Sequence, residues 1–197
     1  MLIINEAQQS DAPIITDVIS EAFTTDPTWA WAFPDLSARK KFWTLLVNNA
    51  LRFPYVLKTQ GFEAVSVWTP PNCSELTPEA EEYLPETLRE LVGNRATEVL
   101  ELIVKFEEAH PHHEPHYYLG LLGTQDSHRG RGIGLALLRE CLARFDAEKV
   151  PTYLESSNPI NNHKYLAVGF EPVVTFNAPN NGPIITGMWR PYSANKR

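Results

Sequence analysis

Cysteine is scarce in this sequence: only Cys73 and Cys141 occur among 197 residues. The two lie far apart, without the spacing of a metal-binding motif, and Cys141 falls on the apolar stripe of a predicted helix. We therefore expect no disulfide and no metal site, as is usual for a protein of the reducing cytoplasm. Residues 1–5 turn polar at once, which predicts no signal peptide, and no apolar run approaches the length of a membrane span.

Positive charge is also in deficit, because 17 Lys and Arg residues face 24 Asp and Glu residues, for a net charge of −7. A nucleic-acid partner needs a basic face, so this balance argues against one, whereas a small cationic amine stays compatible with it. The hydrophobic fraction of 43% is ordinary for a globular protein. A chain of this length, without repeats or low-complexity segments, predicts a single domain over residues 1–197.

Histidine is concentrated in one loop, which holds His110, His112, His113 and His116. A metal site is one interpretation, but this spacing matches no common helix or finger pattern and no thiolate is near. A solvated loop with one packed histidine is the interpretation we favour. His116 is the member of this group with the best claim to bind a substrate, because it opens the strand that leads to the glycine loop.

The most informative stretch runs from residue 116 to 170. An apolar strand over 117–124 is followed by the loop Arg129-Gly130-Arg131-Gly132-Ile133-Gly134, and a helix with a stripe of apolar residues follows. The N-terminus of a helix presents unpaired N–H groups and a positive dipole, and glycines let a phosphate reach that backbone. Two arginines add charge, so the loop suits an anion with more than one phosphate.

Other glycine loops fit poorly. The P-loop ends in Gly-Lys-Ser/Thr, which this loop lacks, and the dinucleotide fingerprint needs a third glycine or alanine where Leu135 stands. A glycine turn that merely starts a helix remains the alternative interpretation of the loop alone.

Three motifs in order resemble the GNAT superfamily of N-acetyltransferases, and the branch around puromycin N-acetyltransferase in particular. They are Arg129-x-x-Gly132-x-Gly134, the preceding strand at 121–124, and the run 154–161 with Tyr165 and Gly169-Phe170. The resemblance implies an α/β (α+β) protein with the GNAT fold, whose central mixed, mostly antiparallel twisted sheet of six to seven strands is flanked by helices. It further implies an acetyl-CoA-binding core over 110–172 and a helical insertion near the acceptor site over 70–109.

The resemblance also implies residue roles. Backbone groups of Leu122 and Thr124, with Gly123 between them, would hold the pantetheine arm of acetyl-CoA, and the Asn161 side chain would bind the same cofactor. The Tyr165 hydroxyl would protonate the leaving thiolate, a task within reach of a phenol. The pyrophosphate would be cradled by the N–H groups of Gly130, Arg131, Gly132, Ile133, Gly134 and Leu135, beside the charge of Arg129.

Some positions depart from the pattern of the family. His163 and Lys164 stand where relatives usually have Pro and an aromatic residue, Thr124 replaces a Val, and Asp126 replaces a Pro. These changes concern access of the acceptor more than binding of the cofactor. They leave the identity of the acceptor in doubt, but not the reaction class.

Outside the motifs, patterns predict a strand over 2–4, a helix from Ser10 or Asp11 to about 23, a helix over 37–51, and a hairpin of strands 55–58 and 62–68. In the second strand of the hairpin, alternation places Ala64, Ser66 and Trp68 on one face and Val65 and Val67 on the other. The segment 70–109 is predicted to be mostly helical, with interruptions near Pro85 and Gly93-Asn94, and strands over 171–176 and 184–190 end the fold. Residues 26–34 are rich in aromatic side chains. Trp29, Trp31 and Phe33 either line an acceptor pocket or pack in the core.

These observations predict direct transfer of an acetyl group from acetyl-CoA to a primary amine, because no Ser or Cys nucleophile motif suggests an acyl-enzyme. Glu155 is a candidate base for the amine, and a structural strand residue is its alternative role. A non-catalytic acyl-CoA-binding regulatory module and a transferase for longer acyl chains are the competing functions. The acceptor stays open among antibiotics, aminonucleosides, polyamines, amino acids and peptide N-termini, and a homodimer is compatible with the sequence.

Overall fold

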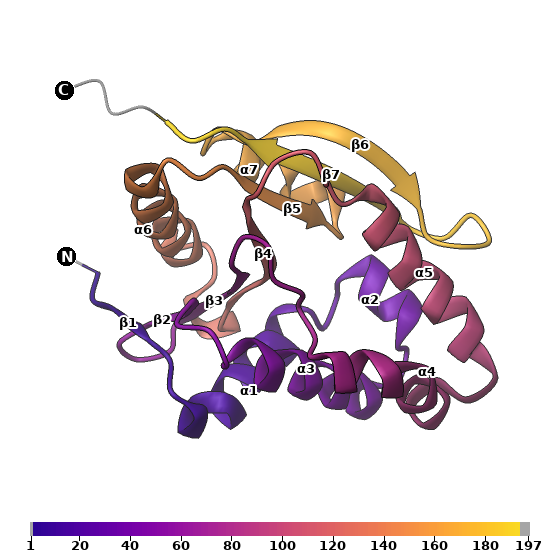
Figure 1. The fold of residues 1–197 in the computed structure, drawn as a ribbon. Coiled ribbons are helices and arrows are strands. Elements are labelled where there is room, and N and C mark those ends of the chain that lie inside the picture. The colour runs from indigo at the N-terminus through magenta and orange to yellow at the C-terminus, as the bar shows by residue number, and fades with distance from the viewer. Residues whose placement is uncertain (1, 194–197) are drawn as a thin grey trace.

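The structure, a computed structural model, describes residues 2–193. Its centre is one sheet in the order β1-β2-β3-β4-β5-β7-β6 (Figure 1). Every neighbouring pair is antiparallel except β4 and β5, which run parallel. The strands are β1 Ile4–Glu6, β2 Val56–Thr59, β3 Ala64–Thr69, β4 Tyr117–Thr124, β5 Thr152–Ser156, β6 Glu171–Asn177 and β7 Ile184–Arg190. The predicted fold class, a mixed and mostly antiparallel sheet with flanking helices, is therefore confirmed.

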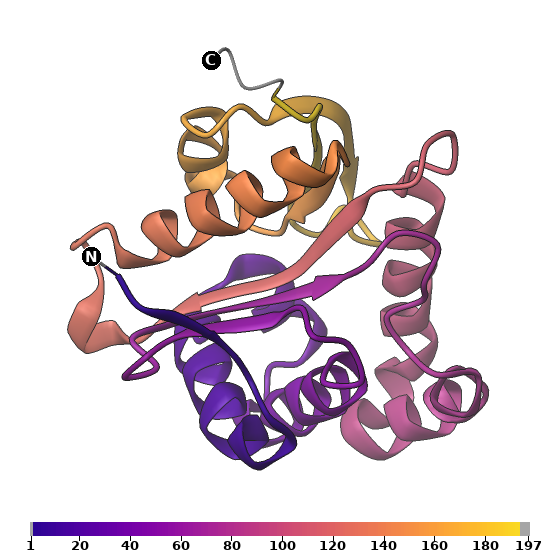
Figure 2. The same cartoon turned by 60° about the vertical axis from the view of Figure 1, so that its left-hand side comes forward.

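Helices cover both faces of this sheet, and Figure 2 shows α6 on one side of the strands and α1 with α3 on the other. The helices of the described chain are α1 Ala12–Ala22, α2 Pro27–Ala32, α3 Leu36–Ala50, α4 Pro78–Val92, α5 Ala96–Ala109, α6 Ile133–Glu148 and α7 Asn162–Leu166. Among residues 2–193, none combines the length and the apolar character that crossing a bilayer requires.

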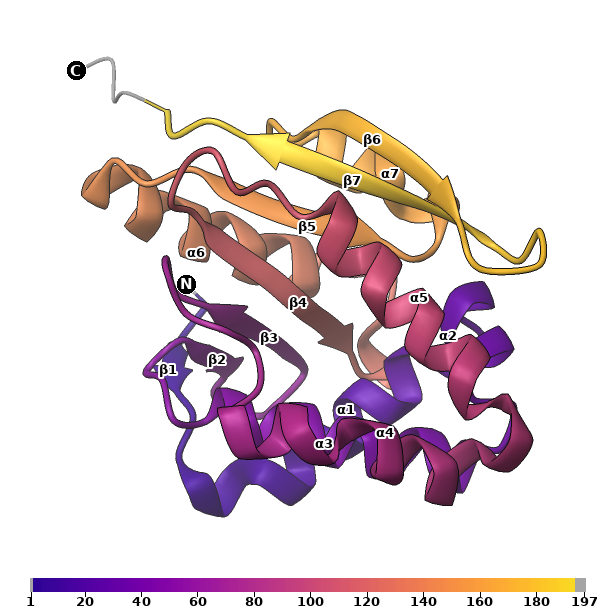
Figure 3. The same cartoon turned by 45° about the vertical axis from the view of Figure 1, so that its right-hand side comes forward.

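Strand β3 lies between the two covered faces. Its predicted alternation is confirmed, because Ala64 and Trp68 belong to the apolar cluster under α6, whereas Val65 and Val67 belong to the cluster under α1 and α3. All six residues of the strand are buried, since helices lie on both of its sides. Figure 3 shows α4 and α5 closing the side of the molecule beyond these strands.

One local prediction is wrong, and one helix was not predicted. The helix α4 runs unbroken through Pro85, although proline removes one helical hydrogen bond. Burial of Leu84 and Leu88 against the core offsets that loss. The predicted break at Gly93 is confirmed, where a φ of +57° ends the helix.

Helix α2 was not predicted. Asp26 caps it by accepting hydrogen bonds from the backbone N–H groups of its first turn, and Pro27 occupies its first position.

Candidate active site

The site begins where β4 and β5 part. Their parallel pairing covers only Tyr117–Leu119 against Thr152–Leu154, although both strands continue beyond it. Against β3, the register shifts at the same level, since Val67 pairs with Leu121 and Trp68 pairs with Leu119, which leaves Gly120 as a bulge. The edge of β4 that faces β5 therefore has no strand partner after Leu119 in the described chain.

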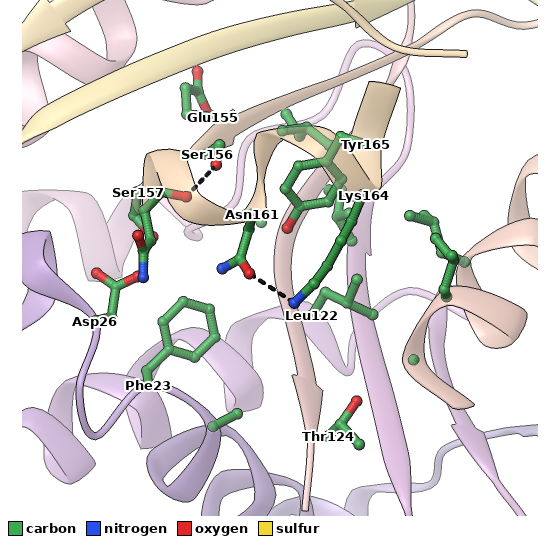
Figure 4. Close-up of a pocket in the computed structure, with 18 of the residues that line it drawn as sticks. Phe23, Asp26, Leu122, Thr124, Glu155, Ser156, Ser157, Asn161, Lys164 and Tyr165 are labelled. Carbon is green, nitrogen blue, oxygen red and sulfur yellow. Dashed lines mark hydrogen bonds between the residues drawn. The ribbon is translucent and has the colours of Figure 1, made fainter. Parts of the chain in front are cut away.

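A cavity of about 490 Å³ fills this wedge and extends along the first turn of α6 (Figure 4). Its wall combines segments that are far apart in the sequence: the turn before α2, the end of β4, the glycine loop, and the chain from β5 to α7. The predicted site residues that line it are Trp29, Leu122, Thr124, Arg129, Gly130, Gly132, Ile133, Gly134, Leu135, Glu155, Asn161 and Tyr165.

One end of the cavity is formed by the start of α6. Gly132 occupies the N-cap with a φ of +75°, a region that favours glycine, and no side chain caps the helix. The first helical hydrogen bond runs from the N–H of Ala136 to the carbonyl of Gly132. The three N–H groups before Ala136 therefore have no helical acceptor, which is the arrangement that binds an anion.

Glycine is also needed at position 134, where the helix approaches the end of β4. A Cβ atom on Gly134 would lie 2.5 Å from Oγ1 of Thr124. The close approach brings the open edge of β4 and the free N–H groups of α6 to the same cavity wall. Gly123 points the other way, since its Cβ would lie 3.0 Å from Cδ1 of Ile19 in α1.

The two arginines of the loop differ in their surroundings. Arg129 donates to the carbonyl of Ala22 at the C-terminal end of α1, at 2.8 Å, and its Nε lies 2.6 Å from the Asp126 carboxylate. Its charge therefore holds the loop against the negative end of a helix dipole. Arg131 is exposed and is not part of the cavity wall.

Polar side chains from α7 and the turn before it enter the cavity from the opposite side (Figure 4). Oδ1 of Asn161 accepts a hydrogen bond of 2.8 Å from Nζ of Lys164. Tyr165 packs edge-on against Phe170, with ring centroids 6.1 Å apart. Burial, with a smaller contribution from the charge of Asp26, raises the pKa of Tyr165 to about 12, so this phenol keeps its proton at neutral pH.

Asp26 is a buried part of the wall that sequence reasoning missed. Its carboxylate accepts hydrogen bonds from the N–H groups of Thr28 and Trp29 and from the Ser157 hydroxyl, at 3.1, 3.1 and 2.7 Å. Thr28 in turn donates to the carbonyl of Ser157. Burial raises the pKa of Asp26 despite these hydrogen bonds. The network fixes α2 to the loop after β5, and an aspartate before a proline was the available signal for it.

Glu155 differs from Asp26 in having no such support. Its side chain is 1% exposed, and neither carboxylate oxygen has a hydrogen-bond partner in the described chain. The phenols of Tyr118 and Tyr153 lie beside it, but the Tyr153 hydroxyl donates to the carbonyl of Ala109 instead. Burial, with the nearby charge of Glu75, raises the pKa of Glu155 to about 8.

A second carboxylate, that of Glu75, lies at the β4 bulge, although no sequence pattern singles it out. A Cβ atom on Gly120 would be 2.6 Å from Oε1 of Glu75. Burial raises the pKa of Glu75 to about 7, and the charge of Glu107 acts in the same direction. Glu75, beside the cavity, and Glu155, in its wall, therefore hold protons far more tightly than free carboxylates do.

Four residues were candidates for the wall of an acceptor pocket, three of them with core packing as the alternative, and only Trp29 belongs to the wall of this cavity. It stacks on Phe106 of α5, with centroids 5.9 Å apart and planes 3° apart. Trp31 lies under the guanidinium of Arg95 instead, since residues two apart on a helix point in nearly opposite directions. Phe33 is fully buried against Phe42 in the core.

The fourth of these residues, His116, is buried outside the cavity wall. Its Nε2 lies 2.9 Å from Nε2 of His110, and its ring packs against Trp189 of β7. The prediction that it lines the acceptor pocket therefore does not agree with its position. The loop from α5 to β4 crosses β5 and β7 and brings the two histidines together (Figure 3).

Comparison with known proteins gives a consistent picture. Residues 75–170 match the model of the acetyltransferase (GNAT) family. A solved Corynebacterium glutamicum structure, described as histone acetyltransferase HPA2 and related acetyltransferase, is 26% identical with a TM-score of 0.67, over 100% of this chain and 99% of that one.

Two insect enzymes share the fold at lower identity. The polyamine N-acetyltransferase of Drosophila melanogaster is 16% identical with a TM-score of 0.70, and the match covers 97% of this chain and 100% of that one. The arylalkylamine N-acetyltransferase 2 of Aedes aegypti is 10% identical with a TM-score of 0.67, and the match covers 98% and 99% of the two chains.

Proposed function

This chain carries an acetyltransferase domain of the GNAT family, and from that premise we propose that it acetylates the primary amine of a small molecule by direct attack on acetyl-CoA. One observation carries the proposal: a single cavity joins free N–H groups at the start of α6 to a buried carboxylate without a hydrogen-bond partner, Glu155. The first suits the diphosphate of the cofactor, and the second suits a base for the amine.

The cofactor would be held mainly by backbone. The N–H groups from Gly130 to Leu135 would bind the diphosphate, while the unpaired edge of β4 at Leu122 and Thr124 would pair with the amides of the pantetheine arm. Asn161 would bind the same arm, in exchange for its hydrogen bond to Lys164. The fit is supported by the close contact at Gly134, where any larger residue would meet Thr124. When bound, the cofactor supplies an activated acetyl thioester.

Tyr165 would act as the acid for the departing thiolate. With a pKa of about 12, its hydroxyl is protonated throughout the physiological range and serves as a hydrogen-bond donor. A thiol has a pKa of about 8.5, below that of Tyr165, so as negative charge builds on sulfur the phenol gives up its proton only if the second proton of the amine replaces it. The phenol would therefore stabilise that charge as the carbon–sulfur bond breaks.

Glu155 would remove the proton from the incoming ammonium. An ordinary carboxylate, with a pKa of about 4.3, is a poor base for an amine with a pKa of about 10.4. A pKa of about 8 for Glu155 narrows that gap to roughly two. Both Glu155 oxygens are buried and accept no hydrogen bond of normal geometry in the described chain, so Glu155 would take the proton either directly, after a small movement of its side chain, or through a water.

The acceptor we propose is a small cationic amine. Glu155 and Asp26 belong to the cavity wall, where a bound cation favours the ionised form of a carboxyl group, and Trp29 with Phe106 offers aromatic surface. A cation gains from both features. The amine substrates named for the insect enzymes, a polyamine and arylalkylamines, are compatible with this chemistry.

A thiol-release assay tests the proposal, with acetyl-CoA and a panel of polyamines, arylalkylamines, amino acids and aminonucleosides. Release of thiol with at least one amine, together with the acetylated product by mass spectrometry, is the expected outcome. Tight acetyl-CoA binding without transfer to any amine would instead favour a non-catalytic regulatory module. Longer acyl-CoA donors, tested with the same amines, show whether the protein is instead a transferase for longer acyl chains.

A further inference from the structure

The histidine pair lies directly behind the proposed base. Nδ1 of His110 is 3.8 Å from Oε1 of Glu155, Nε2 of His110 is 2.9 Å from Nε2 of His116, and Nδ1 of His116 is 2.8 Å from the carbonyl oxygen of Glu114. These four groups form a line from the cavity wall to the surface loop, where Glu114 and His113 are exposed.

The hydrogen positions on this line follow from its far end. A carbonyl oxygen only accepts, so Nδ1 of His116 carries a hydrogen and donates it to Glu114. In a neutral imidazole the other nitrogen is then an acceptor, so Nε2 of His110 donates to His116. Nδ1 of His110 is left as an acceptor, and it faces the Glu155 carboxyl group. The N–H hydrogens of His110 and His116 therefore both point away from Glu155, toward the surface loop.

We propose that His110 and His116 carry the proton that Glu155 takes from the acceptor out of the cavity to the solvent. The inference rests on the proposed function, because it needs Glu155 to act as the base. A separate exit is needed, since the cofactor and the acceptor would together fill the cavity that otherwise connects Glu155 with water. A small rotation of either side chain closes the 3.8 Å gap to hydrogen-bonding distance.

The transfer balances as follows. The nitrogen–carbon bond forms and the carbon–sulfur bond breaks, while the ammonium loses two protons in total. One passes to Glu155 before the attack. Tyr165 gives its proton to the thiolate, and the second proton of the amine returns to the Tyr165 phenolate. Glu155 gives its proton to Nδ1 of His110, Nε2–H of His110 passes to Nε2 of His116, and Nδ1–H of His116 goes to water. One proton reaches the solvent, and rotation of the rings restores the starting tautomers.

The surroundings keep the relay neutral at rest. Burial, with the neighbouring histidines, lowers the pKa of His110 to about 4, and burial likewise lowers the pKa of His116. The groups that face Glu155 are Tyr118 from β4, Tyr153 from β5, Glu75 before α4, and Glu107 and His110 from the end of α5. Those that face the histidine pair are His112, His113 and Glu114.

Two variants remove the relay at different points. His110→Asn and His116→Gln keep a polar side chain but cannot pass a proton between two nitrogens. Each is expected to lower the single-turnover rate of acetyl transfer about tenfold or more, with unchanged affinity for acetyl-CoA. Added imidazole is expected to restore part of the rate of His110→Asn. His112→Asn is the matched control, because that histidine is exposed in the same loop and has no place in the relay, so its replacement should leave the rate at neutral pH unchanged.

Retention of the wild-type rate by either variant, once thermal melting and acetyl-CoA titration show it folded, would overturn the relay. The wild-type enzyme gives a further readout that needs no variant. Its single-turnover rate is expected to fall in D₂O with a curved proton inventory, whereas a rate insensitive to D₂O would overturn the proposal. A wild-type protein that releases no thiol with any amine contradicts the proposed function itself, which is a distinct result.

Discussion

Replacement of Glu155 by glutamine should remove activity and add stability at high pH. The side chain is 1% exposed and its pKa of about 8 lies about 3.5 above the ordinary value of 4.5. A raised pKa means that the folded state favours the protonated form. Its stabilising contribution is fully present below pH 4.5 and is lost as the pH rises through about 8. Each unit of pKa difference corresponds to about 1.4 kcal/mol, so above that pH the ionised carboxylate lowers the free energy of unfolding by a few kcal/mol.

The neutral amide of glutamine does not carry this cost. The melting temperature of Glu155→Gln minus that of the wild type should therefore increase from pH 6 to pH 9, by several degrees at about 2–4 °C per kcal/mol for a chain of this size. Any fixed cost of burying the amide cancels in that comparison. The variant should also lose about 10²-fold or more in acetyl transfer, and wild-type kcat/KM should rise with pH toward about 8. A melting difference that stays constant with pH would refute this reasoning.

Three further predictions follow from the site and its support. Tyr165→Phe should lower turnover about tenfold or more with acetyl-CoA affinity unchanged in calorimetry, and unchanged turnover would exclude the acid role. Gly134→Ala should weaken acetyl-CoA binding, and the double variant with Thr124→Ala should restore it, since the atom that a Cβ meets is the threonine hydroxyl. Asp146→Ala should lower the free energy of unfolding by about 3–5 kcal/mol by stranding its buried arginine partner, whereas Asp17→Ala, from an exposed ion pair, should change it by under about 1 kcal/mol in chemical denaturation.

The parts of the site that depend on contiguous residues could be predicted from the sequence. The loop from Arg129 to Gly134 combines glycines, charge and a following apolar stripe within a few residues, so its place at the start of a helix follows from local rules. The alternation of β3 was equally readable. The helix α2 was not, because its six residues give too short a pattern, and the aromatic residues in it point in several directions.

The rest of the site depends on contacts between distant segments. Nothing near Glu75 indicates that it will lie at the bulge of β4, because the bulge itself arises where β3 and β4 shift register. The pairing of His110 with His116 likewise depends on how the loop crosses β5 and β7. The wedge beyond Leu119 results from the divergence of two strands, which residue patterns along either strand do not encode.

The central claim is that the start of α6 and the open edge of β4 hold acetyl-CoA with its thioester between Tyr165 and Glu155. A crystal structure of the protein with coenzyme A tests it most directly. We expect diphosphate oxygens within about 3 Å of the backbone nitrogens of residues 133–135 and the sulfur beside the Tyr165 hydroxyl. A coenzyme bound elsewhere, with this wedge filled only by water, would contradict the account.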